Sequence, residues 1–286
     1  MSTSGLVGVL YGHGHMGRLH ASKLSERPDV TLHIVDPKQG HRPSLPDSFD
    51  FAVIATPTRD HAPVAEPILE RGIPCLIEKP LSNVIIDAQR LASHEHLAVG
   101  HIERFNPVFI PVEDVHPEFI EIQRLAPFTD RSTDLDVIDD LMIHDLDVML
   151  QFLPGEITDI RAKGVGVLTN GPDIVNARLE ISRPNARKAV VSITASRVSE
   201  NTVRTWRLIE PKRYWSLDLE SHTAKRVDWS SGHMVAEPVP VPSIDALTAE
   251  HDSFLTAVRG AGSFTASGSD ALAALQLAQR IRECLA

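Results

Sequence analysis

Three groups of residues along this sequence have types and spacings that could support chemistry. The first is a glycine-rich loop, Gly12-His13-Gly14-His15-Met16-Gly17, which follows a short apolar run at residues 6–10. Glycines at this spacing permit a tight turn and a close approach of the backbone to a pyrophosphate. Asp36 stands 19 positions after Gly17, where its carboxylate would bind the adenosine ribose hydroxyls of a dinucleotide. The alternative interpretation is a glycine-rich turn in an unrelated α/β protein.

The second group is Glu78-Lys79-Pro80, which directly follows an apolar run at residues 74–77. In doubly wound folds, ligands bind beyond the carboxyl ends of such strands. An ammonium group placed there can donate to a substrate hydroxyl or carbonyl oxygen, and desolvation beside other cations can lower its pKa. The alternative is that Lys79 is an ordinary solvated surface lysine.

The third group lies within residues 139–147, Asp-Asp-Leu-Met-Ile-His-Asp-Leu-Asp. On an α-helix, Asp140, His144 and Asp147 share one face, and flanking carboxylates can orient a histidine and make it a better general base. The structural alternative is a helix start in which the acidic residues favour the macrodipole and His144 packs in the core. A metal pair is a third interpretation, but no further ligand occurs at a matching spacing.

Short apolar strands and amphipathic helices alternate through the first hundred residues, and this alternation predicts a parallel sheet with helices on both faces. The expected strands lie at residues 6–10, 30–35, 51–55, 74–78 and 97–101. Residues 37–49 are polar and rich in Pro, Gly and Ser, so the helix and strand expected there are shortened or missing. We therefore predict an α/β Rossmann domain, a doubly wound parallel sheet, over residues 1–103.

The alternation of strands and helices ends at about residue 118, where successive strands begin. The second half therefore predicts an α+β domain on an open antiparallel sheet over residues 104–286. A helix is expected over residues 137–152, and apolar stripes predict two closing helices that can pack back on the first domain. Residues 236–242, Ala-Glu-Pro-Val-Pro-Val-Pro, are expected to form an extended connector instead of a strand. The remaining expected strands are residues 119–125, 157–168, 174–181, 188–195, 202–210 and 214–219.

Composition excludes several classes of function. The net charge of -10 disfavours a general binder of nucleic acid or anionic membranes, which needs surplus Lys and Arg. Cys75 and Cys284 lack metal-ligand spacing, so no metal site is expected. The sequence has neither a signal-peptide pattern nor an apolar run near the roughly 18–20 residues that cross a bilayer, so we expect a cytoplasmic protein.

Taken together, the glycine loop, Asp36, Ala55-Thr56-Pro57 with His61, Glu78-Lys79-Pro80 and the Asp140–His144 helix resemble the Gfo/Idh/MocA oxidoreductases. The resemblance implies a Rossmann domain that binds NAD, with NADP possible, and a second domain whose sheet joins copies into homodimers or homotetramers. It implies that Lys79, Asp140 and His144 act at the carbon that exchanges hydride with the nicotinamide. It also implies cofactor contacts from the following residues: Gly12, Gly14, His15, Met16, Gly17, Asp36, Thr56, Pro57, His61, Glu78 and Lys79.

A narrower likeness is present at residues 100–107, 124–128 and 140–145. These segments are similar to members of the family that oxidise the sugar 3-hydroxyl of UDP-N-acetylglucosamine, so a sugar or nucleotide sugar is the expected substrate. The residues expected to contact it are Arg104, Asn106, Arg124 and Arg131. Alternatives are an inositol or free-sugar dehydrogenase, an enzyme like biliverdin reductase, and a non-catalytic sensor of dinucleotides or sugar nucleotides.

Overall fold

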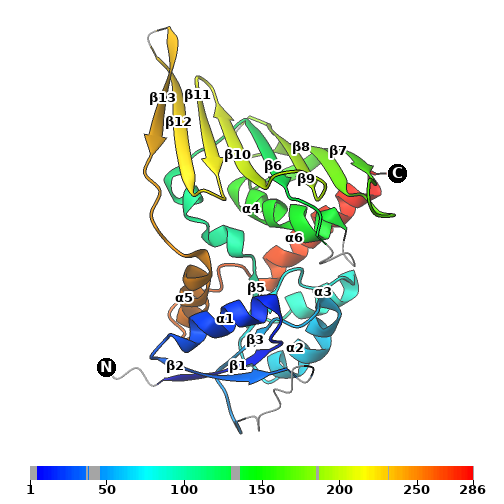
Figure 1. Cartoon of the computed structure of the whole chain (residues 1–286), viewed down its shortest axis with the longest axis vertical. Coiled ribbons are helices and arrows are strands. Elements are labelled where there is room, and N and C mark those ends of the chain that lie inside the picture. Colours follow the sequence, from blue (N-terminus) through cyan, green and yellow to red (C-terminus); the bar gives the residue numbers. More distant parts are fainter. Residues whose placement is uncertain are drawn as a thin grey trace. The chain divides into compact units, whose positions relative to one another are not determined.

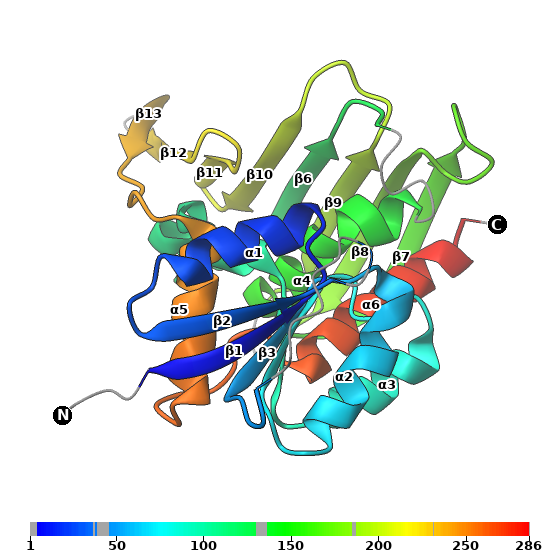
Figure 2. The same ribbon diagram turned by 60° about the horizontal axis from the view of Figure 1, so that its bottom comes forward.

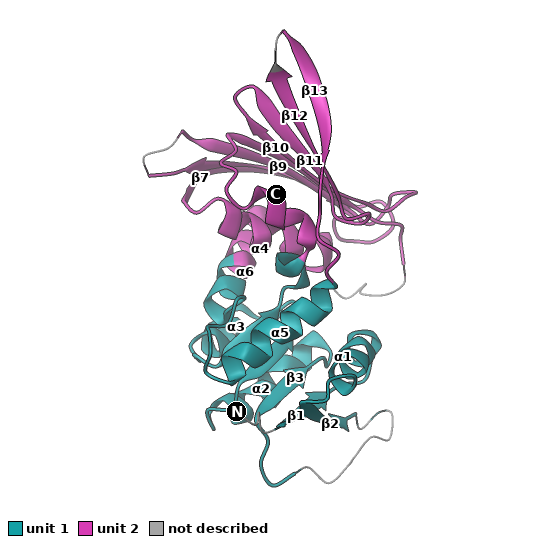
Figure 3. Cartoon of the chain, turned by 90° about the vertical axis from the view of Figure 1, so that its left-hand side faces the viewer, with its two compact units in different colours: residues 1–105, 245–273 teal, residues 106–244, 274–286 magenta. Residues whose placement is uncertain are grey.

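The computed structural model describes residues 5–36, 38, 46–129, 136–184, 187–230 and 232–285. These residues form two compact units, each with its own sheet (Figure 3). Unit 1 contains residues 1–105 and 245–273, and unit 2 contains residues 106–244 and 274–286. Among the described residues, no helix combines the length and apolar character that crossing a membrane requires.

Unit 1 is built on a parallel five-stranded sheet with the strand order β2-β1-β3-β4-β5 (Figures 1 and 2). Its strands are β1 (Leu6–Tyr11), β2 (Val30–Val35), β3 (Phe51–Ile54), β4 (Cys75–Glu78) and β5 (Leu97–Gly100). Its helices are α1 (His15–Ser25), α2 (His61–Leu69), α3 (Ile85–Ala92), α5 (Ala246–Val258) and the first residues of α6 (Gly268–Glu283). Every residue of β3, β4 and β5 is buried, as the apolar runs predicted for a sheet covered on both faces.

The core of unit 1 joins segments that are far apart in the sequence. Phe51 and Val53 of β3 pack with residues of α1 and with Phe254 and Leu255 of α5. The rings of Phe51 and Phe254 meet edge to face, with centroids 5.8 Å apart. Helix α2 packs against α3 and also contacts β3 and β4. Helix α5 is therefore an integral part of the Rossmann unit, although it lies some 150 residues beyond β5 in the sequence.

The described part of the chain places no strand beyond β2, which forms one edge of the sheet. Residues 37 and 39–45 lie outside the described residues, so the shortened connection expected over residues 37–49 stays a prediction. Strand β1 pairs with β2 on one side and with β3 on the other, so the direction in which successive strands are added to the sheet reverses at β1. In open α/β sheets, ligands bind at this switch point, outside the carboxyl ends of the strands.

Unit 2 contains an eight-stranded sheet with the order β13-β12-β11-β10-β6-β9-β8-β7. Its strands are β6 (Phe119–Leu125), β7 (Glu156–Val165), β8 (Ile174–Ser182), β9 (Ala189–Ser196), β10 (Val203–Glu210), β11 (Arg213–Asp218), β12 (Thr223–Ser230) and β13 (His233–Val239). The pairs are antiparallel except for β6 and β9, which run parallel. Helix α4 (Ile143–Phe152) lies along one face of the sheet (Figure 1). Buried and less buried residues alternate along β8 and β9. No described helix of unit 2 covers the other face of the sheet, as the alternating sequence predicts (Figures 1 and 3).

One expectation about this sheet is wrong. Residues 236–239 belong to β13, which pairs with β12 from Ser230↔His233 to Ala224↔Val239, and are not part of an extended connector. Pro238, the single proline within β13, is tolerated because β13 is the edge strand of the sheet, where one side of the backbone has no ladder partner to satisfy. Pro238 lies opposite Lys225 in this register.

Candidate active site

The glycine-rich loop joins the end of β1 to the start of α1 at the switch point of the unit 1 sheet. Gly12 has φ +90°, a conformation that other residues rarely adopt. A Cβ at Gly17 would lie 2.1 Å from the carbonyl oxygen of Gly12, so a larger residue cannot fit without moving the backbone. Around Gly14, by contrast, a Cβ would meet nothing within 4 Å. The loop is thus tight on its inner side and open on its outer side.

The start of α1 is suited to hold an anion. Its N-cap is Gly14, which provides no side-chain hydrogen bond to the first N–H groups of the helix. Such N–H groups and the helix dipole bind phosphate groups in dinucleotide sites. His15 is exposed and Met16 is half-buried at this helix start. The geometry therefore fits the pyrophosphate contact predicted from the glycine spacing.

Asp36 follows β2 and is held beside the glycine loop. Its carboxylate accepts hydrogen bonds from the backbone N–H of His13 at 2.7 Å and of Lys38 at 3.0 Å. The side chain is nearly buried, at 9% exposure. These contacts fix the position of a negative charge next to the loop, which is where a ribose diol would be recognised in a Rossmann fold.

His61, the first residue of α2, links the Thr56-Pro57 turn to the Glu78-Lys79-Pro80 segment. Its Nε2 lies 3.0 Å from the carbonyl oxygen of Thr56, and its Nδ1 lies 3.1 Å from that of Pro80. Burial lowers the pKa of His61, so the neutral ring donates its one N–H to one of these carbonyls at a time. The geometry gives His61 a positioning role between two loops at the carboxyl edge of the sheet, and its predicted contact with the cofactor remains a prediction.

Lys79 stands immediately after β4, at the carboxyl edge where ligands are expected, and the Lys79–Pro80 peptide is cis. The preceding residue, Glu78, is 8% exposed and accepts a hydrogen bond from Nε2 of His20 at 2.7 Å. His20 lies on α1, three residues after the last glycine of the loop. One buried hydrogen bond therefore connects the helix that carries the glycine loop with the residue before Lys79.

Asp140 and His144 belong to unit 2, whereas Lys79 belongs to unit 1. Asp140 lies in a π-helical turn, Ile138–Met142, which runs directly into α4. Asp140 and His144 are both half-buried, but Asp147 is 1% exposed and lies in the core. The shared face predicted for all three residues assumed regular α-helical spacing, and the wider π turn changes that spacing. Isolated π turns of this kind are frequent at functional sites.

The turn that carries Asp140 is anchored at its start. Asp136 accepts hydrogen bonds from the N–H groups of Ile138 and Asp139, both at 3.0 Å. Arg282 of α6 binds Asp136 at 2.8 Å and Asp139 at 2.7 Å. Burial works to raise the pKa of Asp136, but the hydrogen bonds from Arg282 and the backbone outweigh it and lower that pKa. The carboxylate thus stays charged and caps the turn.

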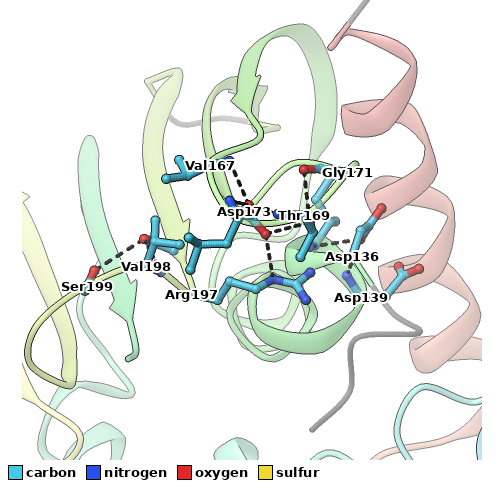
Figure 4. Close-up of polar contacts among 12 residues, drawn as sticks. Asp136, Asp139, Val167, Thr169, Gly171, Asp173, Arg197, Val198 and Ser199 are labelled. Atoms are coloured by element: carbon cyan, nitrogen blue, oxygen red, sulfur yellow. Dashed lines mark hydrogen bonds and ion pairs between the residues drawn. The ribbon is translucent and has the colours of Figure 1, made fainter. Parts of the chain in front are cut away.

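A second anchor in unit 2 is Asp173, which precedes β8 and is fully buried (Figure 4). It accepts hydrogen bonds from the N–H groups of Val167, Leu168 and Thr169 at 2.6–2.8 Å, and Arg197 lies 3.7 Å away. Although burial disfavours the carboxylate, these hydrogen bonds hold the pKa of Asp173 well below its usual range. Figure 4 shows the Arg197 side chain between Asp173 and the turn that contains Asp136 and Asp139.

Arg124, expected to contact substrate, instead joins a buried ion pair. Its guanidinium binds Asp145 through two hydrogen bonds, of 2.5 and 2.9 Å, and the indole N–H of Trp206 donates to the same carboxylate at 2.9 Å. Arg124 and Asp145 are 4% and 2% exposed. A guanidinium this buried and engaged by a bidentate carboxylate is oriented toward the core. The described geometry therefore indicates that Arg124 fixes α4 through Asp145, the residue after His144.

The other predicted substrate contacts also have internal partners or fall outside the described residues. Arg104 is 6% exposed on its side chain and donates to the carbonyl of Thr265 at 2.7 Å and to Asp270 at 3.2 Å. Asn106 is buried and donates to the carbonyl of Leu219 at 3.2 Å. Arg131 lies outside the described residues. Substrate contacts by these side chains remain predictions that the described geometry does not support.

Sequence reasoning missed a group of buried polar residues around Glu78. His20, Glu250 and His251 are 0%, 2% and 1% exposed, and all three lie in unit 1. For His20, a histidine on the buried face of α1 was the available signal. Glu250 and His251 lie about 170 residues beyond Glu78 in the sequence, so no local spacing relates them to it.

Three matches from comparisons with known proteins agree with one another. Residues 41–98 match the family model of an oxidoreductase family with an NAD-binding Rossmann fold, GFO_IDH_MocA. Across 283 residues the chain is 34% identical to UDP-N-acetylglucosamine 3-dehydrogenase of Acidithiobacillus ferrooxidans, covering 89% of this chain and 88% of that protein. The crystal structure of an enzyme of that name and organism superposes with a TM-score of 0.89 and 30% identity, over 98% of this chain and 97% of the other.

A more distant match shows how widely this fold is used. A myo-inositol dehydrogenase from Corynebacterium glutamicum superposes with a TM-score of 0.76 over 98% of this chain and 96% of that chain. At 22% identity, this match shows a shared fold and not a shared substrate.

Proposed function

Since the chain belongs to the Gfo/Idh/MocA family of NAD-dependent oxidoreductases, we propose that it oxidises the 3-hydroxyl of the sugar ring in UDP-N-acetylglucosamine. The observation that carries the choice of substrate is the 34% identity, over 89% of the chain, to an enzyme named for this reaction. The structure adds a dinucleotide loop and a carboxyl-edge lysine that fit the chemistry.

The residues of unit 1 fit a nicotinamide dinucleotide. The cradle formed by Gly12 and Gly17, the uncapped start of α1 and the fixed carboxylate of Asp36 match its pyrophosphate and ribose. When bound, the dinucleotide supplies the hydride acceptor. Asp36 favours NAD over NADP because its carboxylate accepts hydrogen bonds from ribose hydroxyls and repels a 2′-phosphate.

His144, Asp140 and Lys79 would have different roles in the reaction. His144 would take the proton of the reacting hydroxyl as a general base while hydride leaves the same carbon. Asp140 would orient His144 or bind a neighbouring hydroxyl. Lys79 would donate to the reacting oxygen and stabilise the negative charge that develops on it.

Inositol oxidation is the second candidate. Residues of this chain are 29% identical to inositol 2-dehydrogenase 4 of Saccharopolyspora erythraea over 137 residues, but the match covers 43% of the chain. The more complete match to the nucleotide-sugar enzyme makes UDP-N-acetylglucosamine the first substrate to test. We place the reaction in the cytoplasm, where nucleotide sugars and NAD are available.

The open face of the unit 2 sheet is the surface we propose for assembly into homodimers or homotetramers. Exposed side chains alternate with buried ones along β8 and β10, and Trp229 and Met234 on the last hairpin are about half exposed. Light scattering coupled to size exclusion measures the assembly. A monomeric protein at micromolar concentration would contradict this part of the proposal.

The test of the function is NADH formation from UDP-N-acetylglucosamine, with a carbonyl trap to pull the equilibrium forward. Lys79→Ala and His144→Ala should each lower turnover by roughly 10² or more, the scale of general acid–base assistance, and leave the dinucleotide affinity nearly unchanged. Lys188→Ala and His96→Ala are matched controls because both side chains are exposed and lie outside the proposed site.

Three other results would point elsewhere. Turnover of free inositols without any of UDP-sugars would move the assignment to the second candidate. Near wild-type turnover in both Lys79→Ala and His144→Ala would mean that the chemistry lies on other residues. Tight dinucleotide binding without turnover of any sugar would indicate a sensor.

A further inference from the structure

A chain of buried polar side chains in unit 1 ends at Glu78, the residue before Lys79. Nε2 of His20 is 2.7 Å from Oε1 of Glu78, and Nδ1 of His20 is 2.8 Å from Nε2 of His251. Glu250, the neighbour of His251 on α5, is 2% exposed, and neither oxygen of its carboxyl group has a hydrogen-bond partner among the described residues. An ionised carboxylate without hydrogen bonds in such a place would be very costly.

The hydrogen bonds restrict the charge states of this chain. Burial, followed by the influence of His20, lowers the pKa of His251 to about 3, so His251 is neutral near pH 7. With Glu78 accepting from His20, the negative charge of the group resides on Glu78. Burial and the Glu78 charge both raise the pKa of Glu250, since two adjacent buried carboxylates cannot both ionise at low cost.

The fold also shapes the space around Glu78. Gly100 of β5 lies directly opposite Glu78 in the β4–β5 register. A Cβ at Gly100 would lie 3.0 Å from Oε1 of Glu78 and 3.2 Å from its Cδ. The missing side chain at Gly100 thus provides the space that the Glu78 carboxylate occupies.

We propose that Glu250 is a protonated carboxylic acid whose neutrality leaves the Glu78 carboxylate bound to His20, and that His20, itself bonded to His251, fixes Glu78 and so positions the adjoining Lys79. The role of Lys79 rests on the proposed function, but the protonation of Glu250 does not. The group joins three elements of unit 1, because α1 carries His20, β4 ends at Glu78 and α5 carries Glu250. Glu250 and His20 are positioning residues in this proposal, since they act through Glu78.

The other charged groups near Glu250 have partners of their own. Glu250 lies on α5, which packs against α1 and against the 3-10 turn Ile102–Phe105. The other titratable residues on these three elements are His15, Arg18, Lys23, Glu103, Arg104 and Asp252, of which His15 and Arg18 are exposed. Lys23 pairs with Asp245 at 3.2 Å, Asp252 pairs with Arg27, and Arg104 pairs with Asp270. Glu78 is the charged group that acts on Glu250.

A bound cation is the competing explanation. The ligand atoms of His20, Glu78 and Glu250 lie within 4.8 Å of one another, and a divalent ion could neutralise two carboxylates. The hydrogen bond between His20 and Glu78 satisfies both groups without a metal, whereas a metal would displace the proton between them. The experiment below separates the two explanations.

The first measurement is thermal stability against pH for Glu250→Gln, which replaces a neutral acid by a neutral amide of similar shape. A carboxyl group whose pKa is raised by folding stabilises the protein below its unfolded pKa, and this contribution is lost as pH rises through the folded pKa. Between about pH 5 and about pH 8, the Tm of Glu250→Gln should therefore rise by several degrees relative to wild type. Glu70→Gln, at an exposed position, should show a difference that does not depend on pH.

The second measurement reports on Lys79 without any substrate. Acetylation of its amine by a soluble reagent, followed by mass spectrometry, should become several-fold faster in Glu250→Ala and His20→Ala and return to the wild-type rate in Glu250→Gln. Exposed Lys188 provides the internal reference. With an active substrate, kcat should follow the same order, falling in Glu250→Ala and recovering in Glu250→Gln, while KM for the dinucleotide stays constant.

Two outcomes overturn the proposal. A Tm difference between Glu250→Gln and wild type that is the same at every pH, with equal Lys79 acetylation in all variants, means that Glu250 neither holds a proton nor positions Lys79. A rise in the Tm of chelator-treated wild type on adding Zn²⁺, Mn²⁺ or Mg²⁺, absent in Glu250→Gln, means that the group binds a cation. Failure of every candidate sugar would remove the proposed function but leave both measurements valid.

Discussion

Removing the charge of Asp145 tests how α4 is held next to His144. In Asp145→Asn, the bidentate ion pair with Arg124 is lost, and the guanidinium, 4% exposed, remains buried without its anion. Removing one partner of such a pair typically costs about 3–5 kcal/mol. At about 2–4 °C per kcal/mol for a domain of this size, we expect the Tm to fall by roughly 6–20 °C. The retained hydrogen bond from Trp206 favours the lower half of that range.

Calorimetry or urea unfolding of wild type and three variants, Asp145→Asn, Asp159→Asn and Arg124→Met/Asp145→Leu, isolates the pair. Asp159→Asn is the matched control, because its partner Arg161 is exposed and surface pairs contribute about 0–1 kcal/mol. The double variant Arg124→Met/Asp145→Leu should recover most of the lost stability, since apolar residues of similar volume can replace a buried pair. A loss below about 1 kcal/mol in Asp145→Asn would refute the assignment of a buried charge pair. A stable double variant with a strongly raised KM for the sugar would restore Arg124 as a substrate contact.

Three further perturbations address the other elements of the site. Gly17→Ala should abolish dinucleotide binding in a fluorescence titration, because its Cβ would lie 2.1 Å from the carbonyl oxygen of Gly12; unchanged affinity would contradict the tight-loop argument. Wild type should prefer NAD to NADP, and Asp36→Asn should narrow that preference by removing the charge that repels a 2′-phosphate; equal affinities in wild type would refute it. Asp173→Asn should destabilise unit 2 by about 2–3 kcal/mol near pH 7, with a smaller loss in acid. The sign follows from the lowered pKa of Asp173, whose stabilisation is present above its unfolded pKa and is lost as pH falls through its folded pKa.

The fold was predictable wherever the determining signal is local. Glycine spacing, the apolar run of β1 and Asp36 specify a strand, a turn and a helix within about thirty residues, and the structure confirms the Rossmann unit they predict. Prolines misled the prediction for residues 236–239, because a proline is acceptable on one side of a strand only if that strand is at an edge. Whether a strand lies at the edge depends on the whole sheet and cannot be inferred from the sequence of that strand alone. The parallel pairing of β6 and β9 was unforeseen for the same reason.

The site shows the same division between local and long-range information. Lys79 and Asp140 were predicted from short motifs, whereas the partners that hold their neighbours come from distant segments. Glu78 meets His20 across 58 positions, and Arg124 meets Asp145 across 21. An arginine in a sequence does not reveal whether a buried carboxylate faces it, which is why Arg124 was assigned to the substrate. Pairing of this kind becomes visible only when the tertiary contacts are known.

A common arrangement supports the residues proposed to do chemistry in the two units. Glu78, the residue before Lys79, and Asp145, the residue after His144, are buried carboxylates, each held by a basic side chain from another element. Buried pairs add little net stability, because desolvation offsets most of their attraction, so stability alone does not explain two of them at these positions. What such pairs do provide is a fixed orientation through directional hydrogen bonds. We infer that each pair fixes the backbone beside a reacting side chain, so that losing either one would lower kcat more than it changes the affinity for the dinucleotide.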